Sequence, residues 1–277
     1  MSAAAPSPPP GPPPPETLER WAFDYLTSND LAHKLAPPPC PRGFEEAPAP
    51  RRIDRPGRPP ALVQARERFK TPGPEALRSP ARRAALVHTF LHHELQAAEL
   101  MCWAILAFPE APRAFRAGLA GVARDEIRHM ALYQAHLGRL GCRFGDLPVR
   151  DWFWERIPGA ASPAAFVAAM GIGFEGGNLD HTRRFAERFR AVGDEEGAQL
   201  QELVGAEEIT HVRFARTWFA TFTGKSDFGA WVAHLPAPLS PILMRGLPLD
   251  REARRAAGLS DDFLDALERW HDRGPGS

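Results

Sequence analysis

Four long segments of the chain combine helical apolar spacing with a lack of internal proline. In each segment apolar residues recur every three or four positions, which is the pattern of a helix with one face in a protein core. The segments cover residues 79–108, 112–140, 162–193 and 194–224. Each is long for a globular helix, so the pattern predicts an all-α protein built around a bundle of four long helices.

Local signals support these boundaries. Ser79 and Ser162 each precede a proline, as expected of a capping serine followed by proline at the first helical position. Asp194 is a suitable cap for the fourth helix, and Gly141 provides a glycine signal for the end of the second. Short links within the first and second pairs of helices require antiparallel neighbours, whereas residues 142–161 are enough to cross the length of the bundle. We therefore expect two antiparallel hairpins joined by one long crossover.

The rest of the chain divides by its proline content. Residues 1–15 form an Ala/Pro-rich stretch, which predicts a disordered tail. Residues 16–78 predict short N-terminal helices and a connector packed on the bundle, which itself spans residues 79–224. Residues 225–277 predict short C-terminal helices that begin at caps such as Asp227 and Ser260.

Composition narrows the class of protein. The formal net charge is zero, which disfavours nucleic acid or an acidic membrane as a partner. Neither a signal peptide nor a membrane-length apolar run is visible, and the three cysteines have no paired spacing. We therefore expect a cytoplasmic protein. Residues 51–83 hold ten Lys or Arg against three acidic residues, and we interpret this segment as a solvated connector, with a phosphate-binding patch as the alternative.

Six acidic and imidazole side chains lie in the apolar stripes of the four helices. Two Glu-x-x-His motifs, Glu126–His129 and Glu208–His211, fall on the second and fourth helices, and single glutamates fall on the first and third, at Glu94 and Glu175. Isolated buried carboxylates are costly, and four that face one another repel or stay protonated unless cations join them. The pattern therefore predicts a site for two divalent metal ions. A buried network of Glu–Arg pairs and capped histidines is the alternative.

The ligand types narrow the metal. Carboxylates with one imidazole per ion suit iron or manganese, because zinc usually takes more histidine or cysteine. We expect iron first and manganese second. A third Glu-x-x-His motif, Glu268–His271, points away from the apolar side of the last helix, and we interpret it as a surface coincidence.

Several polar residues near the six are assigned other roles. Glu99 and Asp180 follow Glu94 and Glu175 by five residues, so each faces a different side of its helix. We expect them to support the ligands from behind or to join helices. His92 and His93 are expected at the surface or behind the ligands. Asp125 and Glu207 are expected to be solvated or salt-bridged.

At this point the chain resembles the ferritin-like superfamily, whose dinuclear centres use a Glu from each of two helices and Glu-x-x-His from the other two. More closely it resembles a bacterial family known only as a domain of unknown function, family 455. The resemblance runs from about residue 16 to the C-terminus and rests on HHELQAAELMCWAILAFPEAP, DEIRHMALY, DWFWERIP, GFEGGNLDH and EEITHVRFA. It implies that Glu126 and Glu208 bridge the metals, that Glu94 and Glu175 are terminal ligands, and that His129 and His211 each hold one ion.

The resemblance leaves several functions open, because one fold hosts many chemistries. We favour a di-iron or iron/manganese oxidase or oxygenase that acts on a small organic substrate and takes electrons from a separate reductase. Two features support this: almost half the chain lies outside the bundle, and four glycines surround Glu175, where they could open a cavity or a bulge. The alternatives are a ferroxidase, peroxide-removing or iron-handling protein, a tRNA-modifying monooxygenase that uses the basic segment, and a metal-free structural bundle. Self-association as a homo-oligomer is left open.

Overall fold

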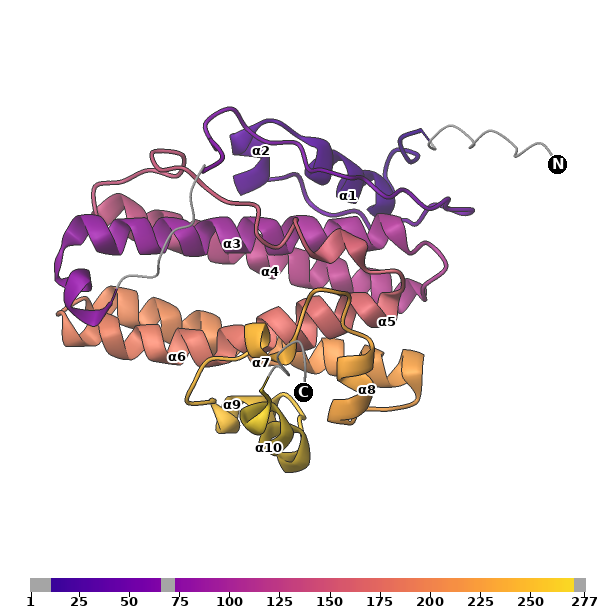
Figure 1. Cartoon of the computed structure of the whole chain (residues 1–277). Helices are drawn as coiled ribbons and strands as arrows, with labels where there is room; N and C mark the ends of the chain where they lie inside the picture. Colours follow the sequence, from indigo (N-terminus) through magenta and orange to yellow (C-terminus); the bar gives the residue numbers. More distant parts are fainter. Residues whose placement is uncertain (1–10, 66–72, 272–277) are drawn as a thin grey trace.

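Four long helical segments form the centre of the molecule. The structure is a computed structural model that describes residues 11–65 and 73–271, and within these ranges all regular structure is helical. The long segments are α3 (Pro80–Ala107), α4 (Arg113–Arg139), the run from α5 (Pro163–Phe166) to α6 (Gly176–Ala191), and α7 (Glu195–Thr223). Figure 1 shows them side by side, with α3 packed along α4, α6 packed along α7, and α4 also in contact with α7.

The helix ends agree closely with the boundaries expected from the sequence. Ser162 and Asp194 accept hydrogen bonds from the backbone N–H groups of Ala165 and Gly197, at 3.2 and 2.9 Å. Ser79 does not: its side chain makes no capping bond, although Pro80 occupies the first turn as predicted. The short helix η1 (Pro74–Arg78) leads into α3.

The third predicted helix is not one continuous α-helix, and it carries the local bulge that the glycines around Glu175 indicated as one possibility. Between α5 and α6 the backbone forms a π-helix, η3 (Val167–Glu175), whose turns are wider than those of an α-helix. Gly171 in this stretch lies so close to α7 that a Cβ atom there would overlap the side chain of Ala215. Gly171 thus lies within a local bulge and also permits close packing of this segment on α7.

The N-terminal residues dock on α3 and α4. The short helices expected here are α1 (Leu18–Thr27) and α2 (Leu31–Leu35), and α1 places Trp21, Tyr25 and Leu26 in the core. Lys34 of α2 is fully buried and pairs with Glu99 of α3 at 2.9 Å. Residues 1–10 of the predicted tail lie outside the described residues. The division of the chain into residues 1–15, 16–78, 79–224 and 225–277 stays a prediction.

The basic segment is only in part the solvated connector that the sequence indicated: Arg52, Arg55, Arg78 and Arg82 are exposed, whereas the three arginines that follow here are not. Among its described arginines, Arg51 pairs with Glu45 at 2.7 Å, Arg58 with Glu99 at 2.5 Å, and Arg83 with Asp194 at 3.1 Å. The side chains of Arg51, Arg58 and Arg83 are 16% exposed or less. Their charges therefore fasten the connector to the helices. Residues 66–72 of this segment lie outside the described part of the chain.

The crossover between α4 and α5, which includes η2 (Ile157–Gly159), is fastened to α3. The Gln96 side chain accepts a hydrogen bond from Phe153 N–H at 3.0 Å and donates one to Arg150 O at 3.2 Å. Trp154 Nε1 donates to Glu99 at 3.0 Å. On its other side Phe153 stacks on Phe174 of η3, with ring centroids 4.9 Å apart. The crossover thus bridges α3 and η3.

The C-terminal residues pack beside α6, η3 and α7, where Figure 1 shows them on the side away from α1 and α2. They comprise α8 (Phe228–Ala233), η4 (Pro241–Met244), α9 (Arg251–Ala256) and α10 (Asp261–Arg269). Asp227 and Ser260 cap α8 and α10 as predicted. In the described parts of the chain, no helix has the length and apolar character needed to cross a membrane.

Candidate metal centre

The six predicted ligands come from all four long segments, and all are buried. Glu94 lies on α3, Glu126 and His129 on α4, Glu175 at the end of η3, and Glu208 and His211 on α7. None of the six is more than 4% exposed. The helical spacing of three residues places the Glu and His of each motif on one face of its helix.

Four of the six form the tightest group. Glu94, Glu126, His129 and Glu208 each offer a donor atom within 4.8 Å of the others. His129 Nδ1 lies 3.4 Å from an oxygen of Glu94 and 3.4 Å from an oxygen of Glu126. Carboxylate and imidazole donors at such spacing could hold a metal ion.

His211 joins this group through Glu126 and Glu208. Its Nδ1 is 3.0 Å from Glu126 Oε1 and 3.0 Å from Glu208 Oε2. Glu126 therefore lies between the two histidines, and the ring centroids of His129 and His211 are 6.0 Å apart. Glu175 lies outside the tightest group, but it is close enough for the charges of Glu208 and Glu126 to raise its pKa.

Both histidines direct Nδ1 inward and bond outward through Nε2. His129 Nε2 is 2.7 Å from Glu207 of α7, and His211 Nε2 is 3.3 Å from Asp125 of α4. Each outer acid thus holds the histidine of the opposite helix. This arrangement fixes the orientation of both rings and increases the basicity of the inward nitrogens.

Sequence reasoning missed the role of Asp125 and Glu207, which were expected only to be solvated or salt-bridged. Glu207 does pair with Arg128, but it also orients His129. The signal was present, because an acid directly precedes the glutamate of both motifs. One helical position rotates a side chain by about 100°, which turns it toward the neighbouring helix.

The carboxylates of the cluster have pKa values that are shifted in opposite directions. Burial raises the pKa of Glu94 well above its usual range, and a hydrogen bond and the charge of Glu126 raise it further. Burial also raises the pKa of Glu175, with the charge of Glu208 next in effect. Burial opposes ionisation of Glu126 too, but its hydrogen bonds with Glu94, His129 and His211 lower its pKa well below normal. The cluster holds protons that a metal ion would displace.

The histidines show the opposite shift. Burial lowers the pKa of His129, but hydrogen bonds to Glu126 and Glu94 outweigh burial and raise it to about 12. The pKa of His211 is likewise raised well above normal, because Glu208, Asp125 and Glu126 outweigh burial. The protein's carboxylates thus favour positive charge at the centre of the cluster.

Unsatisfied oxygens test whether this donor set fits a metal. Oε1 of Glu175 is buried without a hydrogen-bond partner, and the contacts of Glu126 are with other members of the cluster, Glu94, His129 and His211. Buried polar atoms without partners are rare in proteins, and a coordinated cation would satisfy them. Glu208 has two partners: Asn178 Nδ2 donates to its Oε1 at 3.0 Å, and its Oε2 lies 3.0 Å from His211 Nδ1. The donor set and the unpaired oxygen of Glu175 therefore fit a metal ion.

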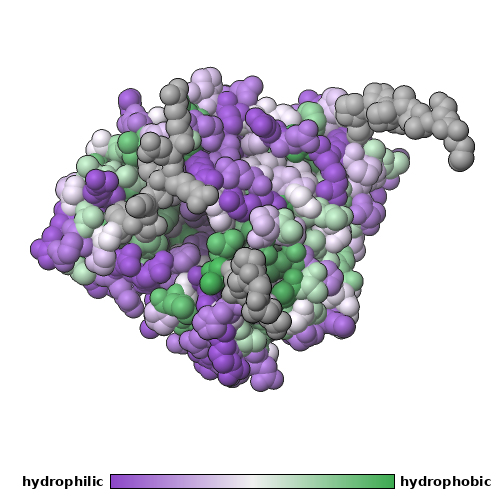
Figure 2. Space-filling model, in the orientation of Figure 1, coloured by the Kyte–Doolittle hydropathy of each residue, from purple (hydrophilic) through white to green (hydrophobic). Residues whose placement is uncertain are grey.

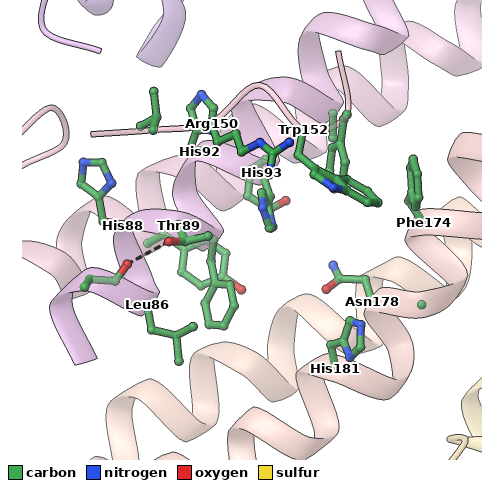
Figure 3. Close-up of a pocket in the computed structure, with 18 of the residues that line it drawn as sticks. Leu86, His88, Thr89, His92, His93, Arg150, Trp152, Phe174, Asn178 and His181 are labelled. Atoms are coloured by element: carbon green, nitrogen blue, oxygen red, sulfur yellow. Dashed lines mark hydrogen bonds between the residues drawn. The ribbon is translucent and has the colours of Figure 1, made fainter. Parts of the chain in front are cut away.

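A cavity of about 650 Å³ reaches the cluster from one side. Glu94 and Glu175 belong to its wall, between α3, the π-helix η3, α6 and the crossover. Figure 3 shows Arg150, His92, His93 and Trp152 on one side of the open space, and Asn178 and His181 across from them. A molecule in this cavity would lie against two of the six predicted ligands.

The residues first assigned to supporting roles separate into two groups. Glu99 and Asp180 join structural elements: Glu99 pairs with Lys34 and Arg58, and Asp180 pairs with the fully buried Arg254 of α9 at 2.7 Å. The two histidines line or adjoin the cavity instead. His92 is buried, and its Nε2 lies 3.3 Å from Asp151 of the crossover. His93 is half-buried in the cavity wall, where burial lowers its pKa to about 3. Glu268 of the third motif is exposed, as predicted, and pairs with Arg251 at 3.0 Å.

The model of a family described as "Protein of unknown function (DUF455)" matches residues 17–265. The chain belongs to this family. The DUF455 region thus includes all six clustered residues and both outer acids. The chain is also 26% identical to an uncharacterized protein of Haemophilus influenzae over 192 residues, which is 66% of either chain. No solved structure matches.

Proposed function

We propose that this protein is a ferritin-like dinuclear metal enzyme, with iron or an iron/manganese pair, that acts as an oxidase or oxygenase on an organic substrate. In this proposal the four long segments are a ferritin-like four-helix bundle. The observation that carries it is the convergence of four carboxylates and two imidazoles from all four segments, at the inner end of a cavity large enough for a small molecule.

The proposed roles follow the contacts of each residue. Glu126 lies between the two histidines, which supports a bridging role for its carboxylate. His129 and His211 would each bind one ion through Nδ1. Glu208, Glu94 and Glu175 would complete the two sites, with Glu208 as the second bridge.

The surrounding residues would serve binding and orientation. Asn178 holds one oxygen of Glu208, and the outer acids hold the imidazole rings. Glu94 and Glu175 face both the cluster and the cavity, so a bound substrate would lie next to the ions. A pair of iron ions would supply the redox capacity for reaction with dioxygen. Oxygenation also consumes electrons, which we expect a separate reductase to deliver.

Oxygen uptake tests this proposal. Protein loaded anaerobically with ferrous iron and then mixed with oxygenated buffer should consume about one dioxygen per pair of ions. Glu126→Ala should reduce both the bound iron and the uptake to the level of free iron. Glu268→Ala is the matched control, because it alters the same motif on exposed α10, and it should behave like the wild type. Uptake in the wild type no faster than that of free ferrous iron would refute an oxidase or oxygenase.

A further inference from the structure

The cavity that reaches the cluster has a buried inner end and an exposed opening. Glu94 and Glu175 at its inner end are at most 4% exposed. Arg82, Pro148 and Leu243, which also line it, are exposed and mark its opening. A molecule that enters would therefore leave one end near these residues and carry the other toward the predicted metals.

Positive charge dominates this cavity. Among the described lining residues the only acids are Glu94 and Glu175, whereas Arg82, Arg150 and Arg156 supply three guanidinium groups. Arg150 and Arg156 share one carboxylate, that of Glu155, at 2.9 and 3.0 Å. No ion pair involves Arg82 in the described part of the chain. Glu94 and Glu175 face the cluster rather than the arginines, so the carboxylate of Glu155 is the one acid paired with any of the three guanidinium groups among the described contacts.

A further arginine stands just behind the wall. Arg184 Nη2 lies 2.9 Å from Nδ1 of His181, a lining residue, and its Nε is buried without a partner. Burial lowers the pKa of His181 to about 4, so its imidazole is uncharged at neutral pH. The imidazole offers a hydrogen bond to a ligand, and the arginines offer charge.

Aromatic side chains form one part of the cavity wall. Phe90, Tyr133, Trp152, Phe153 and Phe174 all line the cavity. Leu243 at the opening is 46% exposed, and its neighbours in the sequence Ile242 and Leu247 are 41% and 53% exposed. Figure 2 shows hydrophobic surface gathered beside a hollow on this face. Aromatic and aliphatic walls favour an apolar ligand body.

We propose that the cavity binds an amphipathic anion: a carboxylate or phosphate head held by a guanidinium group of the wall, that of Arg82 or Arg150, and an apolar body that lies along the aromatic wall. Arginine suits this role because its planar fork matches both heads. As a statement about the substrate the inference rests on the proposed function, but the binding itself needs no metal.

Calorimetric titration of the metal-free chain tests the proposal, with octanoate, octyl phosphate, octanol and octylamine as probes. We expect the two anions to bind, and octanol and octylamine to bind about tenfold more weakly or not at all, because a charge-assisted hydrogen bond is lost. Inorganic phosphate and acetate should bind far more weakly than the octyl anions, since they lack the apolar body. The preferred head, carboxylate or phosphate, follows from comparing the two anions.

Matched variants locate the binding site. Arg82→Gln combined with Arg150→Gln should weaken octanoate binding about tenfold or more. Arg183→Gln removes an α6 arginine that does not line the cavity, so it should leave the affinity unchanged. Phe174→Ala should weaken the binding of both octyl anions. The preference for these anions over octanol and octylamine should stay unchanged. Thermal unfolding of each variant shows whether it is folded.

Equal binding of octanoate, octanol and octylamine would overturn the proposal, as would full affinity in the double arginine variant. Failure of the proposed function is separate. Anion binding in a chain that never takes up metal would leave the cavity assignment intact and remove the enzyme. Metal uptake without anion binding would remove the cavity assignment and leave the proposed function intact.

Discussion

Glu94 and Glu99 of α3 are five residues apart, and replacing each by glutamine should have opposite effects on stability and on metal content. Glu99 accepts from Lys34 Nζ at 2.9 Å, Arg58 Nη1 at 2.5 Å and Trp154 Nε1 at 3.0 Å, while Glu94 faces the cluster. Glutamine has nearly the same shape but no charge. We therefore predict that Glu99→Gln destabilises the fold without removing metal, and that Glu94→Gln removes metal with little loss of stability.

The magnitude follows from burial. Lys34 and Glu99 are both fully buried, and breaking a buried pair by removing one charge costs about 3–5 kcal/mol. Two backbone carbonyls, those of Tyr25 and Leu26, still accept from Lys34 at 2.6 and 3.2 Å, which favours the lower end. About 3 kcal/mol corresponds to a fall in Tm of roughly 6–12 °C for a chain of this size. In contrast, burial and Glu126 raise the pKa of Glu94 well above its usual range, which favours the neutral carboxyl in the metal-free protein.

Thermal unfolding of the metal-free variants and metal content per folded chain are the two assays. Circular dichroism at room temperature confirms that each variant is folded before its metal is counted. A Tm for Glu94→Gln as low as that for Glu99→Gln would refute the division of roles. So would loss of metal from folded Glu99→Gln.

Other residues give further tests. Asp180→Asn removes the charge that holds the fully buried Arg254, and should lower the free energy of unfolding by about 3 kcal/mol; no change in denaturant midpoint would contradict this. Glu207→Gln or Asp125→Asn should weaken metal affinity by about 10–100-fold in a chelator competition while the Tm of the metal-free form stays constant; unchanged affinity would mean that these acids do not orient the histidines. Despite burial, Arg58 and Lys34 lower the pKa of Glu99, so its stabilising effect should be full above the unfolded pKa of about 4.3 and fade as pH drops below it. The stability gap between wild type and Glu99→Gln should therefore narrow in acid, and a constant gap would argue against an ionised Glu99.

The sequence predicted the four long helices because their ends carry local signals. Proline, capping residues and glycine act within one turn, so the starts of α5 and α7 could be placed without tertiary information. Ser79 shows the limit of such signals, since a residue of the right type made no capping bond. The convergence of the motif residues was also predictable, because helical periodicity determines the face on which Glu126 and His129 lie.

Other features depend on tertiary packing that a single sequence does not reveal. The glycines around Glu175 indicated a bulge as one possibility, but a repeat of small and apolar residues looks much the same in a π-helix and in an α-helix, so the extent of the π-helix could not be predicted. Arg51 and Arg58 sit in a charged, proline-rich stretch that resembles a solvated linker, yet their partners Glu45 and Glu99 draw them inward. The cavity itself is formed by segments distant in the chain, from α3 to η4, and its position follows only from the fold.

Elemental analysis tests most directly whether the six clustered residues bind two metal ions. The full chain should be produced in medium rich in iron and manganese, purified without chelators, and measured alongside Glu126→Ala and Glu268→Ala. We predict about two ions of iron, or of iron and manganese, per wild-type chain and per Glu268→Ala chain, with a sharp loss in Glu126→Ala. A folded wild-type protein with no metal, or equal metal in all three proteins, would contradict the central claim.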